Sequence, residues 1–283
     1  MENVLSQEKY KIIQLLQEKY EVGFLGEGIN DAPALKIANV ALVVESAADI
    51  ARDTADIVLL HKSLSVIVEG IRLGRETFAN TNKYIKATLS SNFGNFYTVA
   101  IASLLVNYLP LLPLQILLIN LLTDFPMIAV ATDNIEGEEL KNPKSYNIKE
   151  IALIATLLGV VSSFFDFMFF VLFSRISPSV LQTNWFIGSV LTELVFLFSI
   201  RTKLPFLKAA KPSNIILSLS LVAATVAVTI PFTVFGQHIF SFIWPSFSDL
   251  ILIGTIVFFY LISTEVVKVL YYRSPLYLKL NLK

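Results

Sequence analysis

Six long apolar stretches occupy the chain from about residue 88 onward. Each is near the roughly 20 residues that an α-helix needs to cross the hydrocarbon core of a bilayer. A soluble domain carries more charge on its surface than this chain supplies, since 55% of the 283 residues are hydrophobic and 16% are charged. The sequence therefore predicts six transmembrane helices, at residues 88–109, 113–133, 151–173, 185–201, 214–235 and 249–270.

Basic residues are distributed unevenly between the loops that join these stretches. They collect after the second, fourth and sixth stretches, whereas the opposite loops hold little beyond Arg175 and His238. Because loops rich in Lys and Arg stay in the cytoplasm, this bias places both termini there. Trp185 and Trp244 lie at the predicted outer ends of two helices, where indole rings favour the membrane interface.

The residues before the first apolar stretch have the character of a soluble α/β domain. Short strand-type runs alternate with helical patterns up to about residue 61, which indicates a parallel sheet. A polar helix follows, and no proline interrupts it before the first apolar stretch. The expected strands are 21–25, 40–44 and 56–60, and the expected helices are 7–17, 32–38, 47–53 and a continuous stalk over 62–87.

One motif in this region has the composition of a phosphate and metal site. The segment Gly26-Glu27-Gly28-Ile29-Asn30-Asp31-Ala32-Pro33-Ala34-Leu35 follows the first expected strand and opens a helix. Its two carboxylates, Glu27 and Asp31, therefore belong at the edge of the sheet where ligands usually bind in open α/β folds. Carboxylates combined with phosphate oxygens are what Mg²⁺ prefers, and a helix N-terminus favours phosphate.

Polar residues inside the first two apolar stretches form a second group of candidates. Asn92 and Asn95 are three residues apart, and Asn120, Thr123 and Asp124 likewise share one helix face. Ionisable and polar groups within a bilayer are costly and commonly line a pathway. Oxygen donors in a chain without cysteine suit Mg²⁺, Ca²⁺, Na⁺ or K⁺ better than Cu⁺ or Zn²⁺. Hydrogen bonding between helices, with no ion contact, is the alternative role.

Two further acids lie deep in the later stretches. Asp166 sits among phenylalanines and either lines the ion path or hydrogen-bonds across helices. Glu193 either approaches the ion path or pairs with a neighbouring side chain. Both are candidate ligands of the transported ion.

The motif at residues 26–35 closely resembles the GDGxNDxPAL hinge motif of P-type ATPases, which belong to the haloacid dehalogenase-like superfamily. The resemblance implies that Glu27 and Asp31 bind a catalytic Mg²⁺ and that Asn30 contacts the phosphoryl group. It also implies that Lys9, or alternatively Lys11, neutralises the phosphorylated aspartate. The family usually has Asp where this chain has Glu27, and the longer side chain alters a metal site that demands near-ideal geometry.

The first two apolar stretches resemble the fifth and sixth membrane helices of the same family, where the transported ion binds. This likeness assigns Asn92, Asn95, Asn120, Thr123 and Asp124 as ion ligands. The bacterial magnesium-transporting subgroup is the most similar, which implies Mg²⁺, while residues 123–126 are closer to other subgroups and keep Ca²⁺ or another hard cation open. The segments that carry the subgroup likeness are 90–95, 132–135, 162–166, 185–186 and 200–206.

The resemblance implies a mainly α fold, equivalent to the last six spans of a P-type ATPase after a partial haloacid dehalogenase-like phosphorylation domain. The implied divisions are the phosphorylation domain at 1–61, the stalk helix at 62–87, the six-span domain at 88–273 and a cytosolic tail at 274–283. The family's DKTGT aspartate and nucleotide-binding domain have no counterpart in these residues, so the isolated chain is expected to be inactive.

The expected function is the C-terminal portion of an ATP-driven cation pump in the plasma membrane. Its expected partners are the lipid bilayer, the transported cation and the N-terminal part of the pump, in the same protein or a separate chain, which supplies ATP binding. The formal net charge is zero and no basic stripe is visible, which argues against nucleic acid as a partner. The alternative is a non-catalytic membrane subunit, or a truncated pump half, that binds cations or regulates an intact pump.

Overall fold

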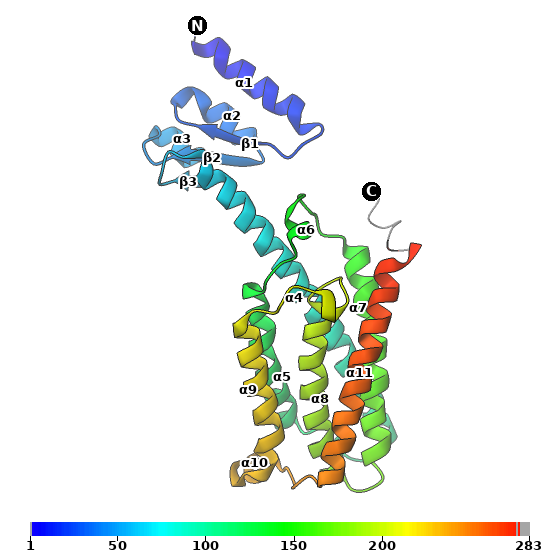
Figure 1. Ribbon diagram of the computed structural model, residues 1–283. Coiled ribbons are helices and arrows are strands. Elements are labelled where there is room, and N and C mark those ends of the chain that lie inside the picture. Colours follow the sequence, from blue (N-terminus) through cyan, green and yellow to red (C-terminus); the bar gives the residue numbers. More distant parts are fainter. Residues whose placement is uncertain (1, 276, 278–283) are drawn as a thin grey trace. The chain divides into compact units, whose positions relative to one another are not determined.

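The computed structural model describes residues 2–275 and 277, with backbone alone for residues 2–5, 95 and 96. It divides into two compact units, Met1–Leu73 and Gly74–Lys283. The first is a small α/β unit and the second is helical (Figure 1).

A three-stranded parallel sheet forms the centre of the first unit. The strands are adjacent in chain order, with Gly23 paired to Val40 and Leu42 paired to Ile57, so the predicted parallel sheet is confirmed. Helix α2 packs on β1 and β2, and α1 packs on α2. The elements are α1 (Glu2–Gln17), β1 (Gly23–Gly26), the 3₁₀ turn η1 (Ile29–Asp31), α2 (Ala32–Ile37), β2 (Val40–Val44), α3 (Asp49–Thr54) and β3 (Ile57–Leu59).

One unbroken helix, α4 (Leu64–Leu105), crosses from the first unit into the second, which confirms the predicted continuity of the stalk with the first apolar stretch. Side-chain caps define the starts of the later helices, since Asn147, Ser177, Ser213 and Ser246 each accept a hydrogen bond from a backbone N–H in the first turn. The long helices that follow are α5 (Pro113–Ile128), α7 (Ile148–Phe173), α8 (Pro178–Ile200), α9 (Asn214–Thr229) and α11 (Phe247–Arg273). Shorter elements are η2 (Ala129–Thr132), α6 (Gly137–Leu140), η3 (Phe206–Lys208), η4 (Ile230–Phe232) and α10 (Val234–Phe240).

Helix α8 lies at the centre of the second unit and packs against α5, α7, α9 and α11, which run beside it (Figure 1). Most of its side chains are buried, whereas the neighbouring helices keep an apolar face exposed. A central helix needs apolar residues on all sides, while the outer helices of a membrane bundle present theirs to lipid.

Five helices of the described chain are long and apolar enough to cross a membrane. They are Pro113–Thr132, Ile148–Phe173, Pro178–Ile200, Asn214–Phe232 and Phe247–Arg273, which match five of the six predicted spans. The predicted span at 88–109 is not among them, because α4 ends at Leu105 and its polar residues, including Ser90, Ser91 and Asn92, lower its hydropathy. The span predicted at 88–109, the first of the six along the chain, therefore stays a prediction.

The prediction that Trp185 lies at the membrane interface, at the outer end of its helix, is wrong. Helix α8 begins at Pro178, so Trp185 lies two turns inside it, with 1% of its surface exposed and its ring against Phe170. The structural reason is that the helix extends seven residues before the predicted start of its apolar stretch at 185. Trp244 is exposed, as an interfacial residue is expected to be.

Candidate functional site

The glycine-rich motif of the first unit is organised by the Asp31 carboxylate. Oδ2 accepts hydrogen bonds from the backbone N–H groups of Glu27, at 3.0 Å, and Gly28, at 3.1 Å. Oδ1 accepts from Lys9 Nζ at 2.7 Å. A Cβ at Gly26 would lie 2.8 Å from the Asp31 Cβ, so only glycine allows this side chain to fold back over the loop. The structure thus brings together Lys9 and Asp31, to which the resemblance assigned separate roles, in one ion pair.

The electrostatics of Asp31 reflect these contacts. Burial opposes ionisation of this carboxyl, but the hydrogen bonds from Lys9, Glu27 and Gly28 outweigh it and hold the pKa of Asp31 below its ordinary value. A depressed pKa contributes stability that is present above the ordinary value, near 3.9, and is lost as the pH falls through the folded-state pKa.

Lys9→Met is therefore expected to make this loop sensitive to acid at a higher pH. Without the ammonium group the pKa of Asp31 rises, so Asp31 protonates sooner as the pH falls and releases the amides of Glu27 and Gly28. Hydrogen exchange measured by mass spectrometry on the full chain near pH 4 checks this, with faster exchange across the motif in the variant than in wild type. Lys11→Met, at a neighbouring exposed lysine, is the matched control, and equal exchange in both variants contradicts the prediction.

Glu27, the other acid of the motif, does not share the contacts of Asp31. The Glu27 side chain is 58% exposed and its nearest cationic neighbour is Lys62, at 3.6 Å. Asn30 is also exposed, and its backbone carbonyl accepts a hydrogen bond from Ser6. Carboxylate oxygens suit Mg²⁺, yet both acceptor positions of Asp31 Oδ2 are used, which leaves Oδ1 and Glu27 as protein ligands. An octahedral ion bound here would take its remaining ligands from phosphate oxygens and water. No group of three or more His, Cys, Asp or Glu side chains suited to a metal occurs within the described residues.

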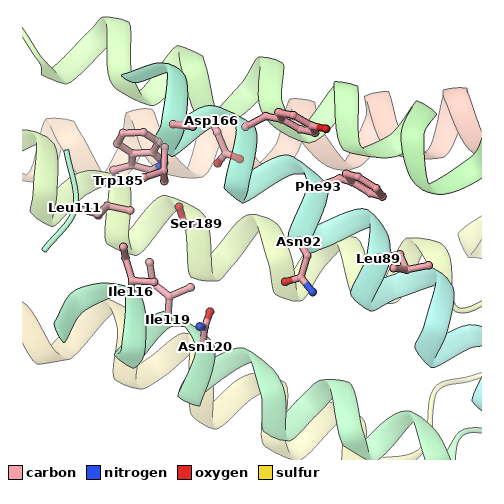
Figure 2. Close-up of a pocket in the computed structure, with 13 residues that line it drawn as sticks. Leu89, Asn92, Phe93, Leu111, Ile116, Ile119, Asn120, Asp166, Trp185 and Ser189 are labelled. Atoms are coloured by element: carbon pink, nitrogen blue, oxygen red, sulfur yellow. The ribbon is translucent and has the colours of Figure 1, made fainter. Parts of the chain in front are cut away.

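A cavity of about 700 Å³ lies within the helical unit (Figure 2). Its polar lining comes from four helices: Asn92 on α4, Asn120 on α5, Asp166 on α7 and Ser189 on α8. Figure 2 shows the Asn92 and Asn120 side chains on facing helices at the same opening. The rest of the wall is mostly apolar, with Trp185 and residues such as Ile116 and Ile119. The structure therefore brings together two of the five predicted ion ligands on the first two stretches, and adds Asp166.

The other predicted ligands lie differently. Thr123 is buried, and its hydroxyl donates to the Ile119 carbonyl of its own helix at 3.0 Å. Asp124 is exposed, as Asn92 and Asn120 also are, but it does not line the cavity; it lies about 40° around the helix axis from Asn120. Glu193 accepts a hydrogen bond from Ser91 of α4. The side chain of Asn95 lies outside the described residues.

Sequence reasoning missed two members of the cavity wall, Trp185 and Ser189. Together with Glu193 they form a stripe at four-residue spacing along α8, so all three occupy one face of that helix. This spacing is a signal that was available in the sequence, but the apolar residues around it gave no indication that the face is turned toward Asp166.

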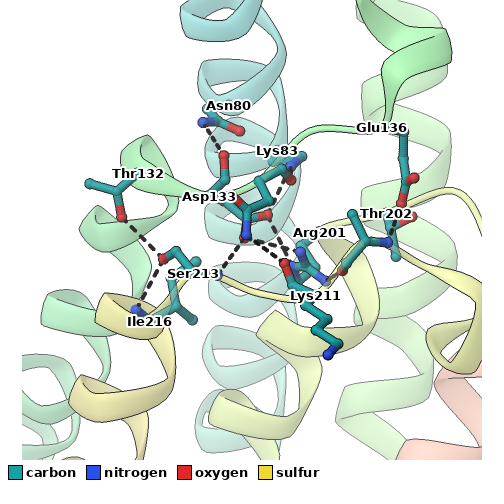
Figure 3. A network of polar contacts seen from close by, with 12 residues as sticks. Asn80, Lys83, Thr132, Asp133, Glu136, Arg201, Thr202, Lys211, Ser213 and Ile216 are labelled. Atoms are coloured by element: carbon teal, nitrogen blue, oxygen red, sulfur yellow. Dashed lines mark hydrogen bonds and ion pairs between the residues drawn. The ribbon is translucent and has the colours of Figure 1, made fainter.

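A second polar cluster joins the middle of α4 to the segments that follow η2 and α8 (Figure 3). The Asp133 carboxylate is completely buried and accepts from Lys83 at 2.8 Å and from Arg201 through two bonds of 3.0 Å. The backbone N–H of Ser213 approaches it at 3.3 Å, and the Asn80 amide donates to the Asp133 carbonyl at 3.0 Å. The cluster thus ties the stalk helix to the loops that follow α5 and α8.

Comparison with known proteins places these features in a family. The model of the cation transporting ATPase C-terminus matches residues 108–270. The magnesium-transporting ATPase, P-type 1, of Salmonella typhimurium strain LT2 is 40% identical over 242 residues, which are 82% of this chain. The chain belongs to the cation-transporting P-type ATPases. The family resemblance predicted from the motifs is therefore confirmed, and this P-type ATPase chain is a multi-pass membrane protein.

Other P-type ATPases give the same assignment. The magnesium-transporting ATPase, P-type 1, of Escherichia coli strain K12 is 38% identical over 82% of this chain. The calcium-transporting ATPase of Bacillus subtilis strain 168 is 34% identical over 71%. The chain spans about a quarter of these relatives, 27% and 24% of their respective lengths, and corresponds to the C-terminal part of the family.

Proposed function

We propose that this chain is the membrane-embedded C-terminal portion of an ATP-driven pump of the plasma membrane, and that the pump transports Mg²⁺. The observation that carries the proposal is that Asn92 and Asn120 line one cavity, in a chain 40% identical to a magnesium-transporting ATPase. Both termini are cytoplasmic in this proposal, and the part of α4 from residue 88 to Leu105 is the first of six spans.

Magnesium fits the cavity better than calcium does. Ca²⁺ takes six to eight oxygen ligands directly, whereas Mg²⁺ dehydrates reluctantly and keeps several waters. Amide oxygens in a cavity of about 700 Å³ suit an ion that retains part of its water shell. The lower identity to the calcium-transporting relative, 34%, points in the same direction.

The exposed face of α5 is consistent with a larger assembly. A carboxylate such as Asp124 is costly to expose to lipid, so it requires a polar or protein environment. We assign this face to contact with upstream membrane segments of the pump, where Asp124 contributes to the transported-ion path. We propose that Thr123, which is buried on α5, and Asn95 of α4 contribute to the same path. The N-terminal part of the pump, in the same protein or a separate chain, is thereby a structural partner of α5.

The first unit has the role of the C-terminal part of a haloacid dehalogenase-like phosphorylation domain at 1–61, followed by the stalk at 62–87. Glu27 and Asp31 would hold the catalytic Mg²⁺, which would supply positive charge to the transferred phosphoryl group. Lys9 keeps Asp31 ionised and adjacent to that group, through its 2.7 Å contact, and Asn30 is placed to contact phosphoryl oxygens. ATP binding and the phosphorylated aspartate come from the upstream domains.

The proposal is tested with an assembled pump. This pump combines the present chain with the polypeptide that carries the upstream domains. In proteoliposomes we expect Mg²⁺ transport coupled to ATP hydrolysis. A fluorescent Mg²⁺ indicator measures the transport, and phosphate release measures the hydrolysis. Asn120→Ala is expected to raise the half-saturating Mg²⁺ concentration about tenfold, equivalent to one weakened ligand. Asn214→Ala, at the exposed start of α9, is the matched control. Co-purification of the two parts with no cation-stimulated hydrolysis contradicts the pump and favours a non-catalytic subunit.

A further inference from the structure

Asp166 occupies an unusual position for a membrane-buried acid. It lies in the middle of α7, only 3% of its surface is exposed, and its side chain lines the cavity (Figure 2). Its nearest hydrogen-bonding side chains are Trp185 and Ser162, yet Oδ2 has no hydrogen-bond partner within the described residues. A buried carboxylate oxygen without a donor is costly, so a ligand that binds oxygen would stabilise it.

The charges around Asp166 also favour a bound ligand. Asp166 is the one carboxylate among the described residues that line the cavity, where Asn92, Asn120 and Ser189 are neutral. Glu193 on the neighbouring helix lies close enough to repel it electrostatically. Two acids near each other in a low-dielectric interior favour a cation or a proton between them, because like charges cannot both remain uncompensated there.

We propose that Asp166 is the anionic ligand of a partly hydrated divalent cation in this cavity, with the amide oxygens of Asn92 and Asn120 as its neutral ligands; the identity of the cation as cargo rests on the pump function proposed above. The size of the cavity agrees, since six waters occupy roughly 180 Å³ in the liquid, well below the 700 Å³ available. Divalent ions are held by few carboxylates when they keep several waters.

The competing role for Asp166 is an interhelical hydrogen bond that only joins α7 to α8 through Trp185. That role needs a hydrogen-bond acceptor and no charge, so asparagine would fill it. A cation ligand needs the negative charge, so asparagine would not. The isosteric substitution Asp166→Asn therefore separates the two roles without altering the packing of the cavity.

The test measures Mg²⁺ binding to the purified full chain in lipid nanodiscs by calorimetry, with Mn²⁺ detected by electron paramagnetic resonance as a second probe. We expect Asp166→Asn to weaken binding of both ions at least tenfold. Asp249→Asn, which removes a carboxylate outside the cavity, is the matched control and should keep the wild-type affinity. Equal affinities of wild type and Asp166→Asn, including no measurable binding by either, overturn the proposal. Thermal unfolding without added cation verifies that the variant is folded.

The assembled pump separates this inference from the proposed function. If wild type shows Mg²⁺-stimulated hydrolysis and Asp166→Asn has the same half-saturating Mg²⁺ concentration, the role of Asp166 is wrong and the pump stands. If wild type shows no stimulation while the chain binds Mg²⁺ through Asp166, the pump function fails and the cation site stands. A tenfold or larger increase in the half-saturating concentration for the variant supports both.

Discussion

Asp133→Ala is expected to lower the free energy of unfolding of the helical unit by about 3 to 5 kcal/mol, the usual cost of removing one partner from a buried ion pair. The substitution leaves Lys83 and Arg201 facing each other with no anion between them, and their side chains are 10% and 2% exposed. The melting temperature in detergent micelles, followed by tryptophan fluorescence, should fall on the order of 10 °C. The melting temperature of Asp133→Asn, which keeps an acceptor oxygen, should fall less.

Glu138→Gln provides the matched control for this prediction. Glu138 also forms an ion pair, with Lys141, and lies in the same connecting segment, but its side chain is 81% exposed. Exposed ion pairs contribute between roughly 0 and 1 kcal/mol, so the melting temperature should scarcely change. If Asp133→Ala and Glu138→Gln shift it equally, the buried cluster does not hold the stalk helix against the loops that follow α5 and α8.

Gly94→Ala is expected to cost about 1 to 3 kcal/mol and to weaken Mg²⁺ binding, because a methyl group at this position has no space. A Cβ on Gly94 would lie 2.7 Å from the Cβ and Oγ of Ser162, where α4 crosses α7. Gly159 of α7 approaches the same crossing, with a Cβ there 3.1 Å from Phe93. Small residues let helix backbones approach closely in membranes, and the two helices of this crossing carry Asn92 and Asp166, which both line the cavity.

Gly254→Ala tests whether the effect of Gly94→Ala belongs to the crossing. Gly254 lies within α11, and no heavy atom of the described residues would lie within 4 Å of an added Cβ. Alanine has the higher helix propensity, so this variant should match wild type or gain up to about 1 kcal/mol. Thermal unfolding and calorimetric titration of both variants provide the comparison. Equal behaviour of the two variants would show that α4 and α7 do not depend on close contact at Gly94.

The sequence alone determined those features whose causes are local. Apolar runs near 20 residues long predicted five helices that are found, and the alternation of runs before residue 61 predicted the parallel sheet. The motif at residues 26–35 pointed to the family, which the comparisons confirm. Hydropathy and motif spacing depend on neighbours along the chain, which is why they are readable without the fold.

The direction in which each polar side chain faces was decided by tertiary structure. Asn120 and Asp124 share a helix face by spacing, yet of the two only Asn120 lines the cavity, a distinction that depends on how α5 packs in the bundle. Trp185 was predicted at the interface and is buried, because α8 occupies the centre of the bundle. Asp166 and Asn92 line the same cavity from helices that cross closely at Gly94, since helix rotation and contact are properties of packing between distant segments.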